Sequence, residues 1–222
     1  MNNMEAIRAR HSVREYTDQP IEPDVLAQLE RVVEKCAHEG NLNIQVLQNN
    51  PQTFDLVARF GLIRGCSTCI AFVANKKTQD EAIGYWGERI VLEAQKLGLN
   101  TCWAGMFSRK RCHAVCPPGM SVRVVIAVGY GKTAGKPRRS KTPEDVVTIE
   151  PGAQKPEWFD VAVEAALLAP TGVNRQDFHI TLAADGSVSF SAPGNGLTNI
   201  DLGIVRRNFE EARAEAVQSI GR

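Results

Sequence analysis

Apolar residues in the first 50 positions recur with helical spacing and then with strand spacing. Residues 4–10 predict a short helix, and apolar positions three and four apart predict a longer one over 25–37. Pro23 fits the first turn of the longer helix, and the Gly-Asn pair at 40–41 fits its end. Apolar and polar residues then alternate over 42–46, which predicts a half-buried strand.

The middle of the chain contains two continuous apolar runs with a helix between them. Residues 70–74 and 122–128 are predicted as buried strands, because nearly every position in them is apolar. Between these runs, the apolar residues of 90–97 keep helical spacing, and Gly98 fits the C-cap of that helix. Helices and strands therefore mix within one region of the chain.

The last third of the chain opens with a polar segment. Residues 131–156 are rich in Gly, Pro, Lys and Arg, and we predict a linker or a wrapping arm there. A helix is predicted over 157–169. Alternation over 178–182 followed by an Asp-Gly-Ser turn at 185–187 predicts a hairpin. A final helix is predicted from about residue 200 onward.

Composition restricts the class of protein. The chain has 222 residues, 43% of them hydrophobic, which is enough for the core of one large or two small domains. Its 26 Lys and Arg nearly balance its 25 Asp and Glu, so no global charge attracts nucleic acid or a membrane surface. No signal-peptide region and no apolar stretch of membrane-spanning length is visible. The sequence predicts a cytoplasmic protein that binds neither nucleic acid nor membrane.

The cysteines admit two interpretations. Spacing pairs Cys66 with Cys69 and Cys112 with Cys116, and four such thiolates suit a tetrahedral zinc site or a cluster. However, Cys66 and Cys69 lead into a predicted buried strand, where they would pack as small hydrophobic residues. In a reducing cytosol, free thiols are also the commoner state. We therefore predict no metal site and keep a four-cysteine metal-binding protein as the weaker alternative.

Two basic segments carry side chains suited to a phosphate. Arg10, Ser12 and Arg14 supply forked guanidinium donors and a short hydroxyl donor within five positions. A solvated basic turn is the alternative for this segment. Residues 136–141 contain four cations in six positions, which suits closure over a phosphate or an exposed charged linker equally well.

Two further segments suit a flat heterocycle. Residues 97–105 run from a helix end at Gly98 into a Trp-Ala-Gly sequence, whose small residues let backbone N–H groups approach a planar ligand. Residues 169–176 (APTGVNRQ) carry hydroxyl and amide groups on a loop shaped by Pro and Gly, and such groups can pair with a ring edge. The alternatives are an ordinary helix-to-strand connection and a self-bonded turn.

Together these four segments resemble the nitroreductase family of FMN enzymes. The matching stretches are RARHSVREYTDQPI, GERIVLEAQKLGLNTCWAG, IAVGYGKTAGKPRRSKTPEDVV and APTGVNRQDF, and they are spread over most of the chain. The resemblance implies an α+β fold with a mixed, largely antiparallel sheet wrapped by helices. One departure concerns the last stretch, where Asp177-Phe178 replaces the Pro-Trp of the family loop, which puts the local loop shape and the substrate pocket in doubt.

The resemblance also implies roles for individual residues. Arg10 and Ser12 would hold the FMN phosphate, with His11 assisting, and Arg14 would lie near the N1–C2=O edge of the ring. The remaining implied cofactor-binding residues are Arg138 or Arg139 at the phosphate, Trp103, Ala104 and Gly105 along the ring, Pro170 shaping the loop, and Thr171, Asn174 and Gln176 hydrogen-bonding the ring. No residue is implied as a catalytic acid or base.

The order of the motifs implies a pseudo-dimer. In the family, the loop that resembles 169–178 follows the N-terminal motif closely and contacts the flavin across a homodimer interface. Here it occurs only in the second part of the chain, which lacks the other three motifs. We therefore expect two pseudo-symmetric halves, 1–150 and 151–222, which together form one FMN site in a monomer.

The function implied by the resemblance is that of an FMN-dependent NAD(P)H oxidoreductase. A reduced nicotinamide would give a hydride to flavin N5, and a small oxidised acceptor such as a nitroaromatic or a quinone would then take its place in a ping-pong reaction. The alternatives are a non-catalytic FMN-binding or sensing module, the four-cysteine metal-binding protein, and a non-flavin interaction domain whose site has decayed.

Overall fold

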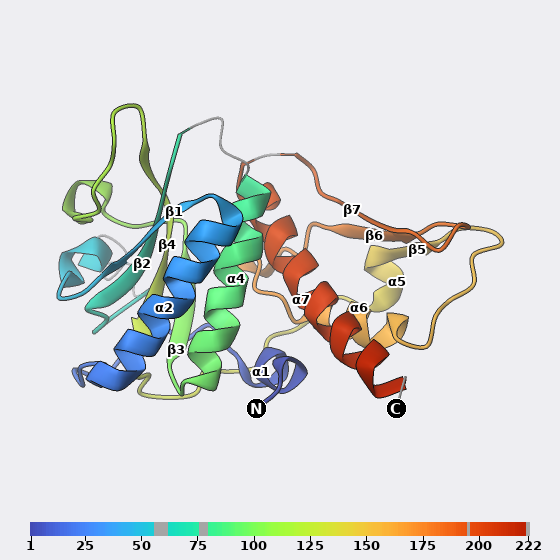
Figure 1. Cartoon of the computed structure of the whole chain (residues 1–222), viewed down its shortest axis with the longest axis horizontal. Coiled ribbons are helices and arrows are strands. Elements are labelled where there is room, and N and C mark those ends of the chain that lie inside the picture. The colour runs from blue at the N-terminus through green and yellow to red at the C-terminus, as the bar shows by residue number, and fades with distance from the viewer. Residues whose placement is uncertain (56–61, 76–79, 195, 221–222) are drawn as a thin grey trace. The chain divides into compact units, whose positions relative to one another are not determined.

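The chain forms two compact units. The structure, a computed structural model, describes residues 1–55, 62–75, 80–194 and 196–220. Two segments make up unit 2, Ala9–Gln79 and Arg89–Pro137. Unit 1 comprises three segments, Met1–Arg8, Asp80–Glu88 and Arg138–Arg222. Figure 1 labels the elements of both units.

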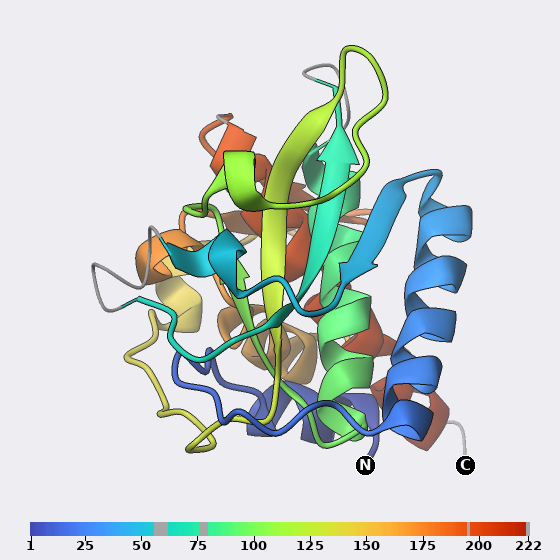
Figure 2. The ribbon, with the colours of Figure 1, turned by 90° about the vertical axis from the view of Figure 1, so that its left-hand side faces the viewer.

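Unit 2 is built on a four-stranded antiparallel sheet (Figure 2). The strands lie in the order β1 (Asn43–Leu47), β2 (Thr68–Ala74), β4 (Ser121–Gly129) and β3 (Asn100–Ala104). Every residue of β2 and almost every residue of β4 is buried, as expected for central strands covered on both faces. The two apolar runs of the sequence therefore form the centre of this sheet, which confirms their prediction as buried strands.

Helix α2 (Pro23–Gly40) begins and ends where the sequence signals lie, and α4 (Asp80–Lys96) ends just before Gly98. Helix α2 starts on its proline, lies along β1, and ends at Asn41, whose φ of 48° is left-handed. Helix α4 belongs to unit 2 from Arg89 onward, and Leu99 N–H donates to the Ala94 carbonyl at its C-terminal end. Two short 3₁₀ turns, η1 (Pro51–Phe54) and η2 (Arg109–Arg111), complete the unit.

One face of the four-stranded sheet carries a cluster of small and sulfur-containing side chains. Cys69 on β2 and Cys102 on β3 both pair with Ala127 of β4, so the three lie in one row across the sheet. Tyr16 is almost fully buried in the same cluster, and its hydroxyl donates to the Ala127 carbonyl over 3.3 Å. Burial raises the pKa of that hydroxyl well above its ordinary value.

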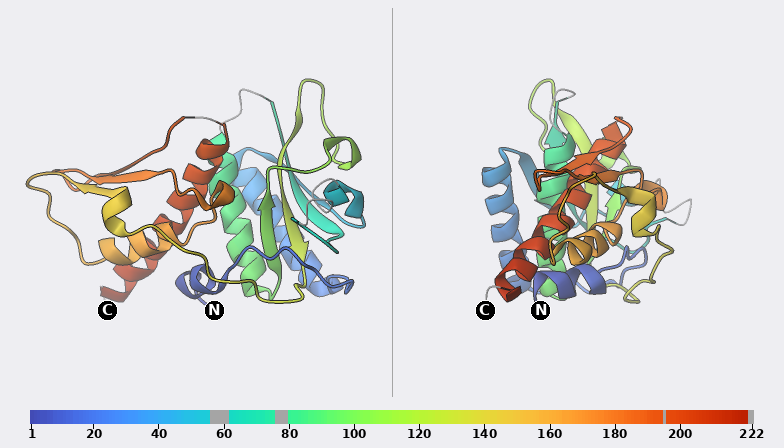
Figure 3. Two further views of the ribbon diagram at one scale, coloured as in Figure 1. Left: turned by 180° about the vertical axis from the view of Figure 1, so that it is seen from behind. Right: turned by 90° about the vertical axis from the view of Figure 1, so that its right-hand side faces the viewer.

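Unit 1 contains a three-stranded sheet and two helices packed against each other (Figure 3). Strand β6 (His179–Leu182) lies between β5 (Val147–Ile149), which runs parallel to it, and β7 (Val188–Ser191), which runs antiparallel. The helices are α6 (Phe159–Leu167) and α7 (Gly196–Ile220), with the short α1 (Asn3–Ala9), α5 (Pro143–Val146) and the 3₁₀ turn η3 (Gly172–Asn174) beside them.

Aromatic side chains join the sheet and the helices of unit 1. The ring of Phe209 on α7 meets Phe190 of β7 edge-on at 5.1 Å, and it meets Phe159 of α6 and Trp158 at 6.0 Å each. Edge-to-face contacts of this kind add to the stabilisation that burial of the rings provides. Phe209 is therefore the centre of this core.

Helices α4 and α7 of unit 1 approach each other through glycine. A Cβ placed on Gly203 would lie 2.0 Å from the Glu81 carbonyl oxygen, and one placed on Gly84 would lie 1.9 Å from the Ile200 carbonyl oxygen. Both contacts are with backbone atoms, which no side-chain movement can relieve. The two backbones thus pack directly on each other, and only glycine fits at either position.

The structure confirms the predicted α+β class with mixed, mainly antiparallel strand pairing. The interpretation of 131–156 as a linker is wrong in part, because α5 and β5 lie within it and β5 is hydrogen-bonded into a sheet. The two pseudo-symmetric halves and the boundary at residue 150 stay predictions. In the described part of the chain, no helix combines the length and apolar character that a membrane span requires.

Candidate functional site

The N-terminal basic cluster, defined as Arg10, His11, Ser12 and Arg14, lies along strand β3 in unit 2. Ser12 forms a parallel bridge with Thr101, and the Val13 N–H donates to the Thr101 carbonyl over 3.0 Å. This short ladder fixes the backbone of the cluster against the sheet. Pairing with β3 therefore determines where the side chains of the cluster lie.

Three polar side chains of the cluster converge on one point of β3. The thiol of Cys102 is hydrogen-bonded to Ser12, and the guanidinium groups of Arg14 and Arg10 lie close enough to oppose the rise that burial causes in its pKa. Arg10 is only 5% exposed, whereas Arg14 is exposed. Two cations and a hydroxyl gathered at the edge of a sheet form a suitable environment for an anionic group.

The segment 130–135 completes the surroundings of the cluster. The Lys132 N–H donates to the Glu15 carbonyl over 2.8 Å, which places this segment alongside the N-terminal one. A Cβ on Gly135 would lie 2.6 Å from the Cβ of His11, so glycine is required for the two backbones to pack this closely. The basic cluster is thus held from two sides, by β3 and by 130–135.

The three predicted ring-lining residues at the end of β3 differ in their surroundings. The indole of Trp103 stacks on Phe72 at 5.7 Å, and Ala104 is buried in the core cluster on the other face of the sheet. Gly105 is exposed. The side chains of Trp103 and Ala104 are therefore used in packing, and the backbone of 103–105 is what this strand end offers a ligand.

In unit 1, the loop 169–176 is tied to the basic segment 138–141. The amide of Gln176, which is 2% exposed, accepts from Lys141 N–H over 2.7 Å and donates to the Ser140 hydroxyl over 3.0 Å and the Leu167 carbonyl over 2.9 Å. Arg138 also donates to the Ala169 carbonyl. Because hydrogen bonds to protein groups occupy the amide of Gln176, the side chain holds the basic segment in position.

Two other residues of the loop keep polar atoms available. Asn174 donates its amide N–H to the Arg139 carbonyl over 2.7 Å, while its Oδ1 is buried and has no hydrogen-bond partner among the described residues. Its φ of 58° is left-handed. The Thr171 hydroxyl accepts from Gln176 N–H over 3.1 Å and keeps its own proton to donate. Pro170 is buried beside them.

Asp201 on α7 gives this loop a pH-dependent contact. Its carboxylate accepts from Gly172 N–H over 2.9 Å, but burial raises its pKa to about 6, and nearby Asp177 adds to the rise. In an unfolded chain the value is about 3.9. The folded protein therefore holds the proton more tightly, and the free energy of unfolding falls as the pH rises from about 4 to about 6.

Asp201→Asn is therefore expected to raise the free energy of unfolding by about 1–2 kcal/mol at pH 8 and to leave it nearly unchanged at pH 4. The neutral amide keeps an oxygen acceptor for Gly172 and removes the cost of a half-buried charge. Urea unfolding at the two pH values measures the difference, with Asp18→Asn at an exposed position as the control. If the gain of Asp201→Asn over the parent is no larger at pH 8 than at pH 4, this explanation is wrong.

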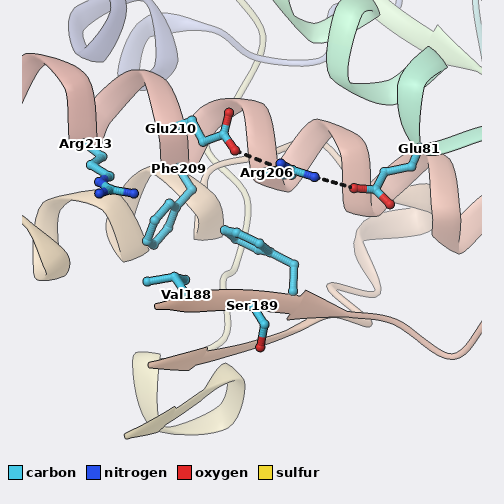
Figure 4. A pocket seen from close by; sticks show the side chains of 8 residues that line it. Glu81, Val188, Ser189, Arg206, Phe209, Glu210 and Arg213 are labelled. Atoms are coloured by element: carbon cyan, nitrogen blue, oxygen red, sulfur yellow. Dashed lines mark hydrogen bonds and ion pairs between the residues drawn. The ribbon is translucent and has the colours of Figure 1, made fainter. Parts of the chain in front are cut away.

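A separate pocket of about 310 Å³ lies in unit 1 between β7 and α7 (Figure 4). Phe190 and Phe209 form part of its wall, and Arg206 crosses it with ion pairs to Glu210 at 2.8 Å and Glu81 at 3.2 Å. None of the residues predicted for a site lines this pocket. The lining holds two arginines, Arg206 and Arg213, and two glutamates, so its formal charges balance and the pocket has no net charge that would attract a charged ligand.

The cysteines do not assemble a metal site in the described part of the chain. No group of three or more His, Cys, Asp or Glu there is placed to hold a metal ion. Cys116 is exposed, whereas Cys66, Cys69 and Cys112 are buried. The thiol of Cys66 donates to the backbone carbonyls of Thr68 and Val128 instead. Within the described residues, the four cysteines paired by spacing therefore do not form one four-thiolate site.

Comparison with known proteins identifies the family. The sequence matches the family described as "Putative TM nitroreductase" over residues 2–213. The chain belongs to this nitroreductase family. No curated protein matches the sequence.

Solved structures of other nitroreductases share the fold. A "putative nitroreductase" of Thermotoga maritima superposes with a TM-score of 0.72 at 23% identity, over 98% of this chain and 86% of its own. A "putative NADH dehydrogenase/NAD(P)H nitroreductase" of Parabacteroides distasonis gives 0.52 at 18% identity, over 65% and 95%. A "putative nitroreductase in complex with FMN" of Desulfovibrio desulfuricans gives 0.50 at 20% identity, over 65% and 94%.

Proposed function

We propose that this nitroreductase binds one FMN and transfers a hydride from NADH or NADPH to a small oxidised acceptor such as a nitroaromatic or a quinone. The observation that carries the proposal is the convergence of Arg10, Ser12 and Arg14 on one point of β3. A buried arginine beside a hydroxyl and a second cation fits the phosphate and the electron-accepting ring edge of FMN. When bound, FMN would supply the hydride-transfer chemistry.

In this proposal the N-terminal basic cluster binds the anionic parts of the cofactor. Arg10 and Ser12 donate to the phosphate, and His11 assists them. The exposed guanidinium of Arg14, which donates to the Ser12 carbonyl over 3.3 Å, would lie near the N1–C2=O edge, where a cation stabilises the negative charge of the reduced ring. The backbone of Trp103, Ala104 and Gly105 contributes N–H groups to the ring.

The loop 169–176 contributes the polar groups of unit 1. The partnerless Oδ1 of Asn174 fits an N–H of the ring, and the hydroxyl of Thr171 fits a ring carbonyl. Arg138 and Arg139 add positive charge for the phosphate, Pro170 shapes the loop, and Gln176 keeps the basic segment in place. One chain supplies all these residues, so we expect a monomer with one FMN.

The proposed activity is tested by steady-state kinetics of the purified protein reconstituted with FMN. NADH and NADPH are varied separately at several concentrations of a nitroaromatic and of a quinone. Parallel double-reciprocal lines are expected, because the donor leaves before the acceptor binds. A protein that holds FMN but oxidises neither nicotinamide is a binding module, and that result would overturn the proposed activity.

A further inference from the structure

We propose that Cys69 and Cys112 form a dithiol site that a small hydroperoxide oxidises to a disulfide. This inference concerns the sheet face of unit 2 and does not rest on the proposed FMN chemistry. The two residues come from separate elements, since Cys69 is the second residue of β2 and Cys112 follows η2 directly. Sequence spacing had paired each of them with a different cysteine.

The two thiols are in direct contact. Each sulfur lies within hydrogen-bonding reach of the other, and the hydroxyl of Thr53 on η1 is hydrogen-bonded to both. Cys69 is fully buried, Thr53 is fully buried, and Cys112 is 7% exposed. Cys112 is therefore the less buried of the two, and it is the residue that a small molecule would reach first.

Asn50 holds the segments that carry the two cysteines. Its backbone N–H donates to the Ser67 carbonyl over 2.8 Å, two residues before Cys69. With the amide oriented to satisfy both of its ends, Nδ2 donates to the Arg111 carbonyl and Oδ1 accepts from His113 N–H, each over 3.0 Å. These contacts bracket Cys112 on both sides. Asn50 is 2% exposed, so its contacts fix the sulfur pair from within the core.

The environment divides the two sulfurs into a nucleophile and a resolving thiol. Hydrogen bonds from Cys69 and the Ala114 N–H, together with Thr53 and the nearby His113, lower the pKa of Cys112. The same contact and its deeper burial raise the pKa of Cys69. The thiolate, which is the reactive form, therefore forms more readily on Cys112 than on Cys69.

The reaction balances without any group outside the site except the peroxide. The Cys112 thiol first gives up its proton, and the thiolate attacks one peroxide oxygen. The O–O bond breaks, Cys112 becomes a sulfenic acid, and the second oxygen takes up the released proton and leaves as an alcohol or water. The Cys69 sulfur then attacks the Cys112 sulfur, the S–O bond breaks, and water leaves. Two thiols are oxidised and one peroxide is reduced.

Peptide mapping of the whole protein tests the site. The reduced protein is treated with one equivalent of hydrogen peroxide at pH 7, alkylated and digested without reductant. We expect a single cross-linked pair of peptides containing Cys69 and Cys112, which reductant separates. Cys116→Ser, which removes an exposed thiol, should leave the cross-link unchanged. Recovery of Cys69 and Cys112 as alkylated thiols, or cross-linking through another cysteine, would overturn the proposal.

Variants distinguish the two roles. In Cys69→Ala the sulfenic acid on Cys112 should persist and be trapped by dimedone, and alkylation of Cys112 at pH 6.5 should slow about tenfold because its thiolate loses a hydrogen-bond donor. In Cys112→Ala no dimedone adduct should form on Cys69. A dimedone adduct that appears on Cys69 first, or an unchanged alkylation rate of Cys112, would contradict the assignment. Circular dichroism checks that each variant is folded.

Discussion

Replacing Gly203 with alanine is expected to lower the free energy of unfolding by at least about 3 kcal/mol. The added methyl would lie 2.0 Å from the Glu81 carbonyl oxygen and 2.7 Å from the Tyr85 nitrogen. Both atoms belong to the backbone of α4, so the helices must separate, and overpacking of a rigid contact costs at the upper end of the usual 1–3 kcal/mol or more. In an ordinary helix, the same substitution would stabilise by about 1 kcal/mol.

Urea unfolding measures this effect. One further variant is a control, and another tests the same contact from the other helix. Ala214→Gln adds more atoms at an exposed position of the same helix and should change the free energy by less than about 0.5 kcal/mol. Gly84→Ala meets the Ile200 carbonyl from the other helix at 1.9 Å and should match Gly203→Ala. A Gly203→Ala protein as stable as the parent would show that α4 and α7 do not cross at these glycines.

Arg10→Met is expected to weaken FMN binding about 10- to 100-fold, the effect of one hydrogen bond to a charged group of about 1.5–3 kcal/mol. Methionine keeps an apolar stem for this nearly buried position and removes the guanidinium. Riboflavin lacks the phosphate, so its affinity should change less than about threefold. The ratio of the two affinities therefore reports on the phosphate contact rather than on folding.

Fluorescence quenching of each flavin during titration gives both affinities. Arg64→Met is a matched control, because Arg64 is also in unit 2 but is exposed and ion-paired with Glu15 at 3.7 Å. It should leave both affinities unchanged. Equal weakening of FMN and riboflavin by Arg10→Met would mean that Arg10 supports the fold and does not contact the phosphate.

The sequence predicts best those elements in which apolar residues form an uninterrupted run or keep a regular spacing. β2 and β4 come from uninterrupted apolar runs, and α2 comes from its helical spacing between a proline and a Gly-Asn pair. β5 was missed for the complementary reason. It has three residues, two of them exposed, within the polar segment 131–156, so it is too short for alternation or an apolar run to mark it. Its place depends on pairing with β6, about 30 residues later.

In the candidate site too, local patterns predict some features, and others depend on distant partners. The resemblance marks Gln176 as a ligand contact, but its amide is hydrogen-bonded to residues 138–141 of unit 1 and to the Leu167 carbonyl. No local sequence pattern predicts a hydrogen-bond partner 35 residues away. The cysteines are similar, because spacing joins Cys112 to Cys116 whereas the fold brings it to Cys69. Residue type predicts the chemistry of a side chain, and only the fold predicts which groups satisfy it.

The central claim, that this nitroreductase works through bound FMN, is tested most directly by the visible spectrum of the purified protein before and after anaerobic addition of NADH or NADPH. We expect a yellow protein that releases FMN on denaturation and whose visible absorption bleaches with one of the two donors. A colourless protein that also fails to take up added FMN would contradict it.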